Sequence, residues 1–145
     1  MRIRRVADAD RPRLFELWQA AVHATHDFLT PDDLAGITEM VRTDYFPAAS
    51  FTVAVDGGDR PLGFIDVEDG TAINALFVDP ACHGQGIGRA LVDAALPQGV
   101  PLTVEVNEQN GAARAVYEHW GFRTIDRKPL DGEGRPYPLL VMRRD

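Results

Sequence analysis

The sequence predicts an α/β (α+β) fold with a mixed central sheet of about six to seven strands, antiparallel in its first half, and about four helices. Residues 51–55, 62–68 and 73–78 have strand patterns separated by short Asp/Gly turns, which is typical of an antiparallel meander. The chain then changes to a strand, loop, helix and strand order over residues 73–106, which makes the sheet mixed. Helix patterns before residue 51 and after residue 110 complete the prediction.

Length and composition indicate an ordinary globular chain. The 145 residues suit one domain, 1–145, and the composition is 45% apolar and 26% charged. No apolar run approaches the roughly 20 residues that span a bilayer, and no apolar segment follows the basic start, so we expect neither a membrane helix nor a secretory signal. Cys82 is the only cysteine, which excludes an internal disulfide and favours a reducing, cytoplasmic location.

The net charge of −7 limits the classes of ligand. Nucleic acid is disfavoured, because phosphate backbones are bound by clustered Lys and Arg side chains. A cationic substrate is mildly favoured. The alternative, that acidity merely keeps a bacterial cytosolic protein soluble, stays open.

Two helices are predicted near the N-terminus, after a short strand at residues 3–6. The first covers about residues 11–24, and either Asp8 or Asp10 can cap it. Its apolar face contains Leu14, Leu17, Trp18, Ala21 and Val22. The second begins at Thr30, with a capping hydroxyl and a proline at the first helical position. Its buried face is predicted to contain Leu34, Ile37, Met40 and Val41.

A glycine-dense loop follows the strand at residues 73–78 and contains Gly84, Gly86 and Gly88. Ile87, Ala90, Leu91 and Ala94 then recur at helical spacing, so the order is strand, glycine loop, helix. Glycines allow a ligand to approach the backbone, and the N–H groups of a helix's first turn attract phosphate oxygens. Arg89 stands where a dinucleotide loop needs a third glycine, and no Lys-Ser/Thr pair is present for a nucleoside triphosphate with Mg²⁺. The sequence therefore predicts a metal-free pyrophosphate site.

A longer pattern surrounds this loop. Val78-Asp79-Pro80 precedes the run HGQGIGRAL, and Asn107, Asn110, Ala113, Tyr117, Gly121 and Phe122 follow it at fixed spacing. This pattern resembles the GNAT family of acyl-CoA-dependent N-acetyltransferases. The resemblance implies the GNAT fold and acetyl-CoA as cosubstrate, with no metal. His83 is a departure, because the family usually has Arg or Gln at that position.

The resemblance also implies which residues bind acetyl-CoA. In the family this loop wraps the CoA pyrophosphate, and the pantetheine arm lies between the fourth and fifth strands. The implied contacts are Leu76, Phe77 and Val78 for the arm, and His83, Gly84, Gln85, Gly86, Ile87, Gly88 and Arg89 for the phosphates. Asn107 and Asn110 are implied to line the acceptor tunnel and to bind the cofactor, respectively. The alternative for Asn110 is a turn and helix N-cap, and both roles are compatible.

Tyr117 is the candidate general acid. Ala113, Val116, Tyr117 and Trp120 share one helical face, so Tyr117 is predicted to point toward the sheet, and Gly121 is predicted to end this helix as a left-handed cap. A departing CoA thiolate leaves more readily when an acid protonates it, and the resemblance gives Tyr117 that role, beside the cofactor. The alternative is a core aromatic that only completes the apolar face.

The general base is left open among Asp66, Glu68 and His26. Asp66 and Glu68 lie two apart on one strand and therefore share a face. In the family a carboxylate hereabouts often acts on the amine, but both can equally form a solvated strand face. His26 has a suitable ordinary pKa of ~6.5. The segment from His23 to Leu29 also resembles the His-x-Phe-Leu segment of one bacterial GNAT subgroup.

Three functions of different class follow from these observations. The first is transfer of the acetyl group of acetyl-CoA to a primary amine, which is a small amine, a lysine side chain or a peptide N-terminus, by direct attack in a ternary complex. The second is a sensor that binds acyl-CoA without turnover. The third is a toxin-like enzyme that acetylates aminoacyl-tRNA, for which Arg2, Arg4, Arg5, Arg11 and Arg13 form a candidate basic patch. A homodimer is compatible with the family resemblance.

Overall fold

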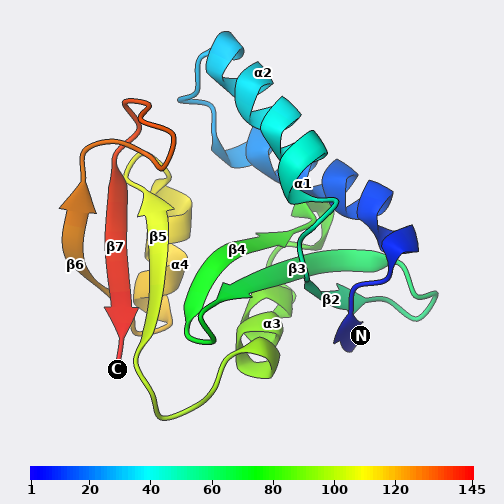
Figure 1. Cartoon of the computed structure of the whole chain (residues 1–145). Helices are drawn as coiled ribbons and strands as arrows, with labels where there is room; N and C mark the ends of the chain where they lie inside the picture. Colours follow the sequence, from blue (N-terminus) through cyan, green and yellow to red (C-terminus); the bar gives the residue numbers. More distant parts are fainter. The chain divides into compact units, whose positions relative to one another are not determined.

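The computed structural model describes residues 1–145 and has the predicted fold class (Figure 1). Seven strands and four α-helices are present. The strands are β1 (Arg2–Arg5), β2 (Thr52–Val55), β3 (Pro61–Glu68), β4 (Ala72–Val78), β5 (Leu102–Asn107), β6 (Arg123–Lys128) and β7 (Leu139–Arg144). The α-helices are α1 (Arg11–Thr25), α2 (Pro31–Met40), α3 (Ile87–Ala95) and α4 (Gly111–His119). Three short helical turns are η1 (Asp8–Asp10), η2 (Val41–Tyr45) and η3 (Pro80–Cys82).

The sheet has the order β1-β2-β3-β4-β5-β7-β6. β1 pairs with β2 and β2 with β3 in antiparallel fashion, which confirms the antiparallel first half. β4 and β5 pair in parallel, at Ala72 with Thr103 and at Ile73 with Val104. β7 pairs antiparallel with both β5 and β6, so the predicted mixed sheet is correct.

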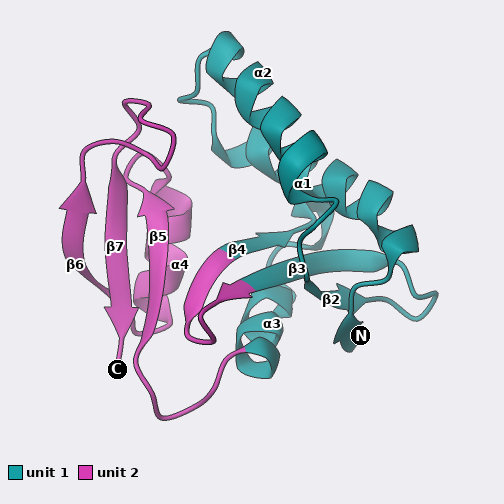
Figure 2. Cartoon of the chain, viewed as in Figure 1, with its two compact units in different colours: residues 1–66, 75–95 teal, residues 67–74, 96–145 magenta.

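The chain divides into two compact units (Figure 2). Unit 1 comprises residues 1–66 and 75–95, and unit 2 comprises residues 67–74 and 96–145. The expectation of a single domain over residues 1–145 stays a prediction. None of the helices combines the length and the apolar character that a membrane crossing requires.

Unit 1 has its main apolar core between α1, η2 and the strands β2 and β3. Ten buried residues form this cluster: Leu14, Leu17, Trp18, Val22, Val41, Phe46, Phe51, Val53, Val55 and Phe64. The predicted face of α1 is buried as expected, because apolar residues recur at helical spacing toward the sheet. Thr30 caps α2 as predicted, since its side chain accepts a hydrogen bond from the backbone N–H of Asp33.

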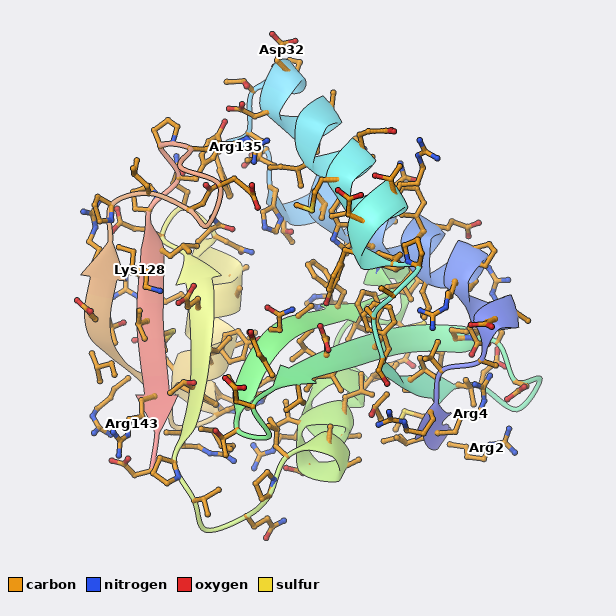
Figure 3. All side chains as sticks on the ribbon, in the orientation of Figure 1. Arg2, Arg4, Asp32, Lys128, Arg135 and Arg143 are labelled. Carbon is orange, nitrogen blue, oxygen red and sulfur yellow. The ribbon has the colours of Figure 1, made fainter.

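The prediction of an aspartate cap on α1 is wrong. Asp10 occupies the N-cap position but makes no side-chain cap bond. Its carboxylate accepts instead from the N–H of Ala7 at 2.8 Å and from Arg4 at 2.7 and 3.0 Å. Arg4, labelled with Arg2 in Figure 3, also contacts Asp59 and thereby joins β1 to the turn after β2. The Arg4 guanidinium holds the pKa of the Asp10 carboxyl below its ordinary value.

The second helix continues directly into a single π turn, η2, which the sequence did not predict. Wider turns of this kind are rare and often occur at functional sites. Here the turn ends at Tyr45, and its closing bond runs from the N–H of Phe46 to the carbonyl of Val41 at 2.9 Å. η2 therefore sets the direction in which Tyr45 leaves the helix.

The third helix, α3, packs against the strands of unit 1 through Ile87, Leu91 and Val92, all of which are buried. Its first residue approaches Gly63 of β3: a Cβ on Gly63 would lie 3.3 Å from a methyl of Ile87. Ala94, expected on this face from its helical spacing, is exposed because the buried stripe runs instead through Val92.

Unit 2 contains β5, β7, β6 and α4 (Figure 2). Tyr117 on α4 is buried as predicted, but Val116 is 38% exposed. Val116 lies about 100° from Tyr117 around the helix, at the border of the buried stripe. Gly121 ends α4 with φ +93°, which confirms the predicted left-handed cap.

Candidate functional site

The glycine loop lies between η3 and α3 in unit 1. Gly84 and Gly86 have φ values of +78° and +76°, which L-residues with a side chain rarely adopt. A Cβ built on either glycine would meet no atom within 4 Å, so their outer sides are open to a ligand. The positive φ values confirm that these glycines serve backbone geometry, and the close approach of a ligand to them stays a prediction.

The loop presents an unbroken row of backbone donors. No N–H group from Gly84 to Arg89 donates to another group of the chain, and Ala90 is the first to do so, to the carbonyl of Gly86 at 3.0 Å. The row ends at the N-terminus of α3, where the helix dipole adds positive potential. Such a row suits the oxygens of a pyrophosphate.

The side chains of the loop contribute less than its backbone. His83 and Gln85 are exposed. Arg89 is 49% exposed and forms an ion pair with Asp93 one turn along α3, at 3.3 Å. The fit to phosphate therefore rests on the backbone row, which the unusual His83 does not alter.

Asp79 anchors the entry to the loop. Its N–H donates to the carbonyl of Leu62 at 2.8 Å, and its carboxylate accepts from the N–H of Ala81 at 3.0 Å and from Arg13 at 2.5 Å. Arg13 also donates to the carbonyl of Pro61 at 3.1 Å. The Ala81 N–H and then the Arg13 guanidinium lower the pKa of Asp79. Sequence reasoning missed this anchor, for which the only local signal was an aspartate directly before a proline.

Leu76, Phe77 and Val78 form the end of β4 and are half-buried. The Phe77 ring lies 5.7 Å from that of Phe64, on the face covered by α1. Val78 faces the other way, toward Gly63. The side chains of Phe77 and Val78 thus lie on opposite faces of the sheet. Contact between the backbone of residues 76–78 and the pantetheine arm of the cofactor stays a prediction.

Tyr117 lies in unit 2 and is 8% exposed. Its ring meets those of Trp120 and Phe122 edge-on, at 5.6 and 5.4 Å. The hydroxyl makes no hydrogen bond within the chain. Burial raises the pKa of Tyr117 well above its ordinary value, so the hydroxyl stays protonated at neutral pH. Arg135 Nη1 is the only fully buried side-chain polar atom that lacks a hydrogen bond, so the unpartnered Tyr117 hydroxyl has some access to the surface and is available to a ligand.

Asn110 is buried and caps α4, since its side-chain oxygen accepts from the N–H of Ala113 at 3.1 Å. Its own N–H donates to the carbonyl of Asn107, the last residue of β5, at 2.9 Å. The turn and N-cap interpretation is confirmed. The additional contacts of Asn107 and Asn110 with substrates stay predictions.

The candidate bases differ in their surroundings. Asp66 is half-buried and accepts a hydrogen bond from the Tyr45 hydroxyl at 2.5 Å, whereas Glu68 is exposed. His26 ends α1, and its Nδ1 lies 2.7 Å from the Thr25 hydroxyl, which itself donates to a backbone carbonyl. His26 Nδ1 is therefore the donor in this contact. The π turn η2 brings Tyr45 to Asp66, and the sequence did not predict this contact.

Comparison with known proteins decides the family. A family model described as an acetyltransferase (GNAT) domain matches residues 19–136. The chain belongs to the GNAT acetyltransferase family. It is 43% identical to the peptidyl-lysine N-acetyltransferase YjaB of Salmonella typhimurium over 138 residues, covering 95% of this chain and 94% of the relative. It is 41% identical to the protein of the same name from Escherichia coli, with coverage of 95% and 92%.

A solved structure agrees with this assignment. The solution structure of apo-form YjaB from Escherichia coli matches with a TM-score of 0.90 and 39% identity, covering 98% of this chain and 95% of that chain. The GNAT fold and the predicted activity class, an N-acetyltransferase, are confirmed. Members of the GNAT family use acetyl-CoA as cosubstrate.

Proposed function

We propose that this GNAT enzyme transfers the acetyl group of acetyl-CoA to the ε-amino group of lysine in peptides or proteins. The acetyl group moves by direct attack in a ternary complex, and Tyr117 is the general acid. The observation that carries the proposal is the row of backbone N–H donors from Gly84 to Arg89.

The row supports binding of the CoA pyrophosphate. The open glycines allow phosphate oxygens to come within hydrogen-bond distance of the backbone, and no side chain of the loop fills that space. Leu76, Phe77 and Val78 are proposed to bind the pantetheine arm through their backbone. Asn110 is proposed to contact the cofactor and Asn107 to line the acceptor tunnel.

The reaction breaks the C–S bond of the thioester as the amine nitrogen forms a bond to the acetyl carbon. The amine releases a proton, and the departing thiolate receives one from the Tyr117 hydroxyl. Retention of the Tyr117 proton at neutral pH supports this role, because an acid must be protonated when it acts. The high pKa of the hydroxyl means that it gives up the proton only as negative charge develops on sulfur.

The lysine acceptor is proposed from the relatives. Two relatives more than 40% identical over 95% of the chain are named peptidyl-lysine N-acetyltransferases. The net charge of −7 is compatible with a cationic acceptor. Small amines and peptide N-termini are the acceptors from which the experiment below must distinguish lysine.

Proton removal from the amine is assigned to Glu68 or His26. Glu68 is an exposed carboxylate, and His26 is an imidazole at the end of α1 whose Nδ1 lies 2.7 Å from the Thr25 hydroxyl. The pH dependence of turnover in Glu68→Gln and His26→Ala distinguishes them, since loss of the base removes the ascending limb.

No specific observation favours the sensor or the tRNA enzyme. A sensor has no use for a protonated hydroxyl held in an aromatic site. The arginines proposed as a basic patch are engaged within unit 1: Arg2, Arg4, Arg11 and Arg13 form ion pairs with carboxylates, and Arg5 donates to Ser50. A cytoplasmic location and a homodimer remain expectations.

The test is a thiol-release assay with acetyl-CoA and three peptides. One has a blocked N-terminus and a free lysine, one has a free N-terminus and an acetylated lysine, and one has both amines blocked. Release with the first peptide alone, and mass spectrometry that locates the acetyl group on the lysine Nε, are expected. Release with the second peptide alone contradicts the lysine acceptor. Stabilisation by acetyl-CoA without release from any amine supports the sensor instead.

A further inference from the structure

Lys128 is the only lysine in this chain. The sequence has 14 arginines and one lysine, although lysine is among the commonest residues of globular domains. An arginine side chain keeps its proton at all physiological pH values, so it is no nucleophile for a thioester. An enzyme that acetylates lysine therefore finds a single ε-amino group on its own surface.

The segment around Lys128 is accessible. Lys128, labelled in Figure 3, is the last residue of β6. All six residues of β6 are exposed, and so are Pro129 and Leu130 after it. β6 lies at the edge of the sheet and pairs only with β7, so the lysine is presented much as in an extended peptide. A lysine on an edge strand also deters pairing with other chains, which is the alternative that the experiment below must exclude.

Glu105 of β5 restrains the Lys128 amine. Nζ of Lys128 donates to Oε1 of Glu105 at 2.5 Å. On β7, Leu139 faces Lys128 and Val141 faces Glu105, so the ion pair bridges β7 and joins the strands on either side of it. The hydrogen bond to the Glu105 carboxylate raises the pKa of Lys128 above its ordinary value. The amine is therefore protonated, and not nucleophilic, while the ion pair is intact.

This ion pair is weak enough to open. The Lys128 side chain is 53% exposed and that of Glu105 is 44% exposed. Water and salt screen such pairs, so they contribute little to stability and exchange readily with the open state. In the open state the amine can lose its proton. Glu105 therefore slows acylation of Lys128 without preventing it.

The ion pair lies on the face of the strands opposite α4. Arg144 of β7 contacts the end of α4, where its guanidinium donates to a backbone carbonyl at 3.4 Å. Side chains alternate along β7, so Val141 points away from α4, and so does its partner Glu105. Tyr117 belongs to α4, and the hydrogen-bonded strands thus separate Lys128 from the Tyr117 of its own chain. Acetylation of Lys128 therefore requires the site of another copy.

We propose that Lys128 is acetylated by a second copy of this enzyme, and that Glu105 limits the rate of this self-acetylation. The inference rests on the proposed function, because it uses lysine as the acceptor and Tyr117 as the acid. The Lys128 ammonium loses a proton, and its nitrogen forms a bond to the acetyl carbon of acetyl-CoA as the C–S bond breaks. The departing thiolate takes the Tyr117 proton of the other copy. Acetylated Lys128 has no charge, so its ion pair with Glu105 does not form again.

The experiment separates the enzyme from the acceptor. The enzyme is Lys128→Arg, which has no lysine and keeps a cation beside Glu105. The acceptor is isotope-labelled Tyr117→Phe, which keeps Lys128 but lacks the proposed acid. Both are mixed with acetyl-CoA, and mass spectrometry follows the acceptor. We expect one added acetyl group, about 42 Da, on Nε of Lys128, at least tenfold faster (~10-fold or more) than in the acceptor alone.

A second substitution in the acceptor tests the restraint. Glu105→Gln removes the charge at nearly constant size, and we expect the initial rate of Lys128 acetylation to rise about two- to fivefold, as loss of an exposed ion pair implies. Glu118→Gln is the matched control, because Glu118 forms an exposed ion pair with Arg114 on α4. It should leave the rate unchanged. An unchanged rate in Glu105→Gln overturns the restraint.

The outcomes separate this inference from the proposed function. The peptide with a free lysine is assayed in parallel with the Lys128→Arg enzyme. Transfer to the peptide without acetylation of the acceptor, or equal acetylation of the acceptor with and without enzyme, overturns the inference and leaves the transferase intact. Acetylation of wild-type Lys128 at a rate independent of protein concentration overturns transfer between copies. Transfer to neither acceptor overturns the proposed lysine acceptor and this inference together.

Discussion

Gly63 on β3 is the position at which the structure leaves least room for a side chain. A Cβ built there would lie 2.9 Å from the carbonyl oxygen of Phe77 and 3.3 Å from methyl groups of Val78 and Ile87. Contacts between carbon and carbonyl oxygen normally begin near 3.3 Å, so the end of β4 must move by about 0.4 Å to admit Gly63→Ala.

The expected cost follows from this geometry. Overpacking in a tight site costs about 1–3 kcal/mol, and replacing glycine by alanine returns about 0.4–1 kcal/mol by restricting the unfolded chain. The net loss is about 1–2 kcal/mol, which for 145 residues corresponds to a fall in Tm of roughly 3–8 °C. Because β4 leads into the glycine loop, we also expect the Kd for acetyl-CoA to rise about threefold or more.

The assay is a thermal melt followed by a calorimetric titration with acetyl-CoA. Gly57→Ala is the matched control: Gly57 lies in the turn after β2, has no positive φ, and a Cβ there would meet nothing within 4 Å. Its Tm should change by no more than about 1 °C. A Gly63→Ala protein that melts with the wild type and binds acetyl-CoA equally well would refute the steric argument.

Three further predictions concern the proposed site. Tyr117→Phe should lower kcat about 100-fold while Tm and the Kd for acetyl-CoA are unchanged, and a fall of less than about threefold in thiol release would exclude the general acid. Gly86→Ala imposes a side chain at φ +76° beside the donor row, so calorimetry should show acetyl-CoA binding weakened about tenfold. Asp79→Asn should destabilise the protein at neutral pH. Since folding lowers the pKa of Asp79, its stabilisation is full above the unfolded value of ~3.9 and is lost as pH falls through the lower folded value. Denaturant melts should therefore show the difference between wild type and Asp79→Asn shrinking below pH ~4, and a constant difference would contradict the linkage.

Much of the fold could be predicted because local signals and tertiary packing agree. The Thr30-Pro31 start of α2 and the Gly121 end of α4 were correct to the residue, since caps and left-handed glycines leave strong sequence signals. The π turn was missed, because Val41 to Tyr45 continues the helical pattern and its widening depends on how Tyr45 packs in the core. Asp10 was misassigned for a similar reason: its partner Arg4 belongs to another element.

The candidate site, like the fold, could be predicted only where its signal lies within one segment of the sequence. The glycine loop is contiguous, so its donor geometry could be predicted from the sequence. Tyr45 could not be matched with Asp66, because no periodicity relates a helical turn to a strand 21 residues away. Alternation predicts that Asp66 and Glu68 share one face of β3, but it does not predict that Asp66 is half-buried while Glu68 is exposed.

The residues that support the glycine loop bear on its proposed role in binding the CoA pyrophosphate. Gly84 and Gly86 lose more conformational freedom on ordering than other residues, so a loop held only at its ends would lose affinity to that entropy. Arg13 and Asp79 fix the entry to the loop, and the close approach of Gly63 to Ile87 fixes its exit into α3. Arg13, Asp79 and Gly63 lie outside the donor row. We therefore expect the affinity of the proposed phosphate site to depend also on residues that do not touch the phosphates, and a motif based on the loop alone leaves these three out.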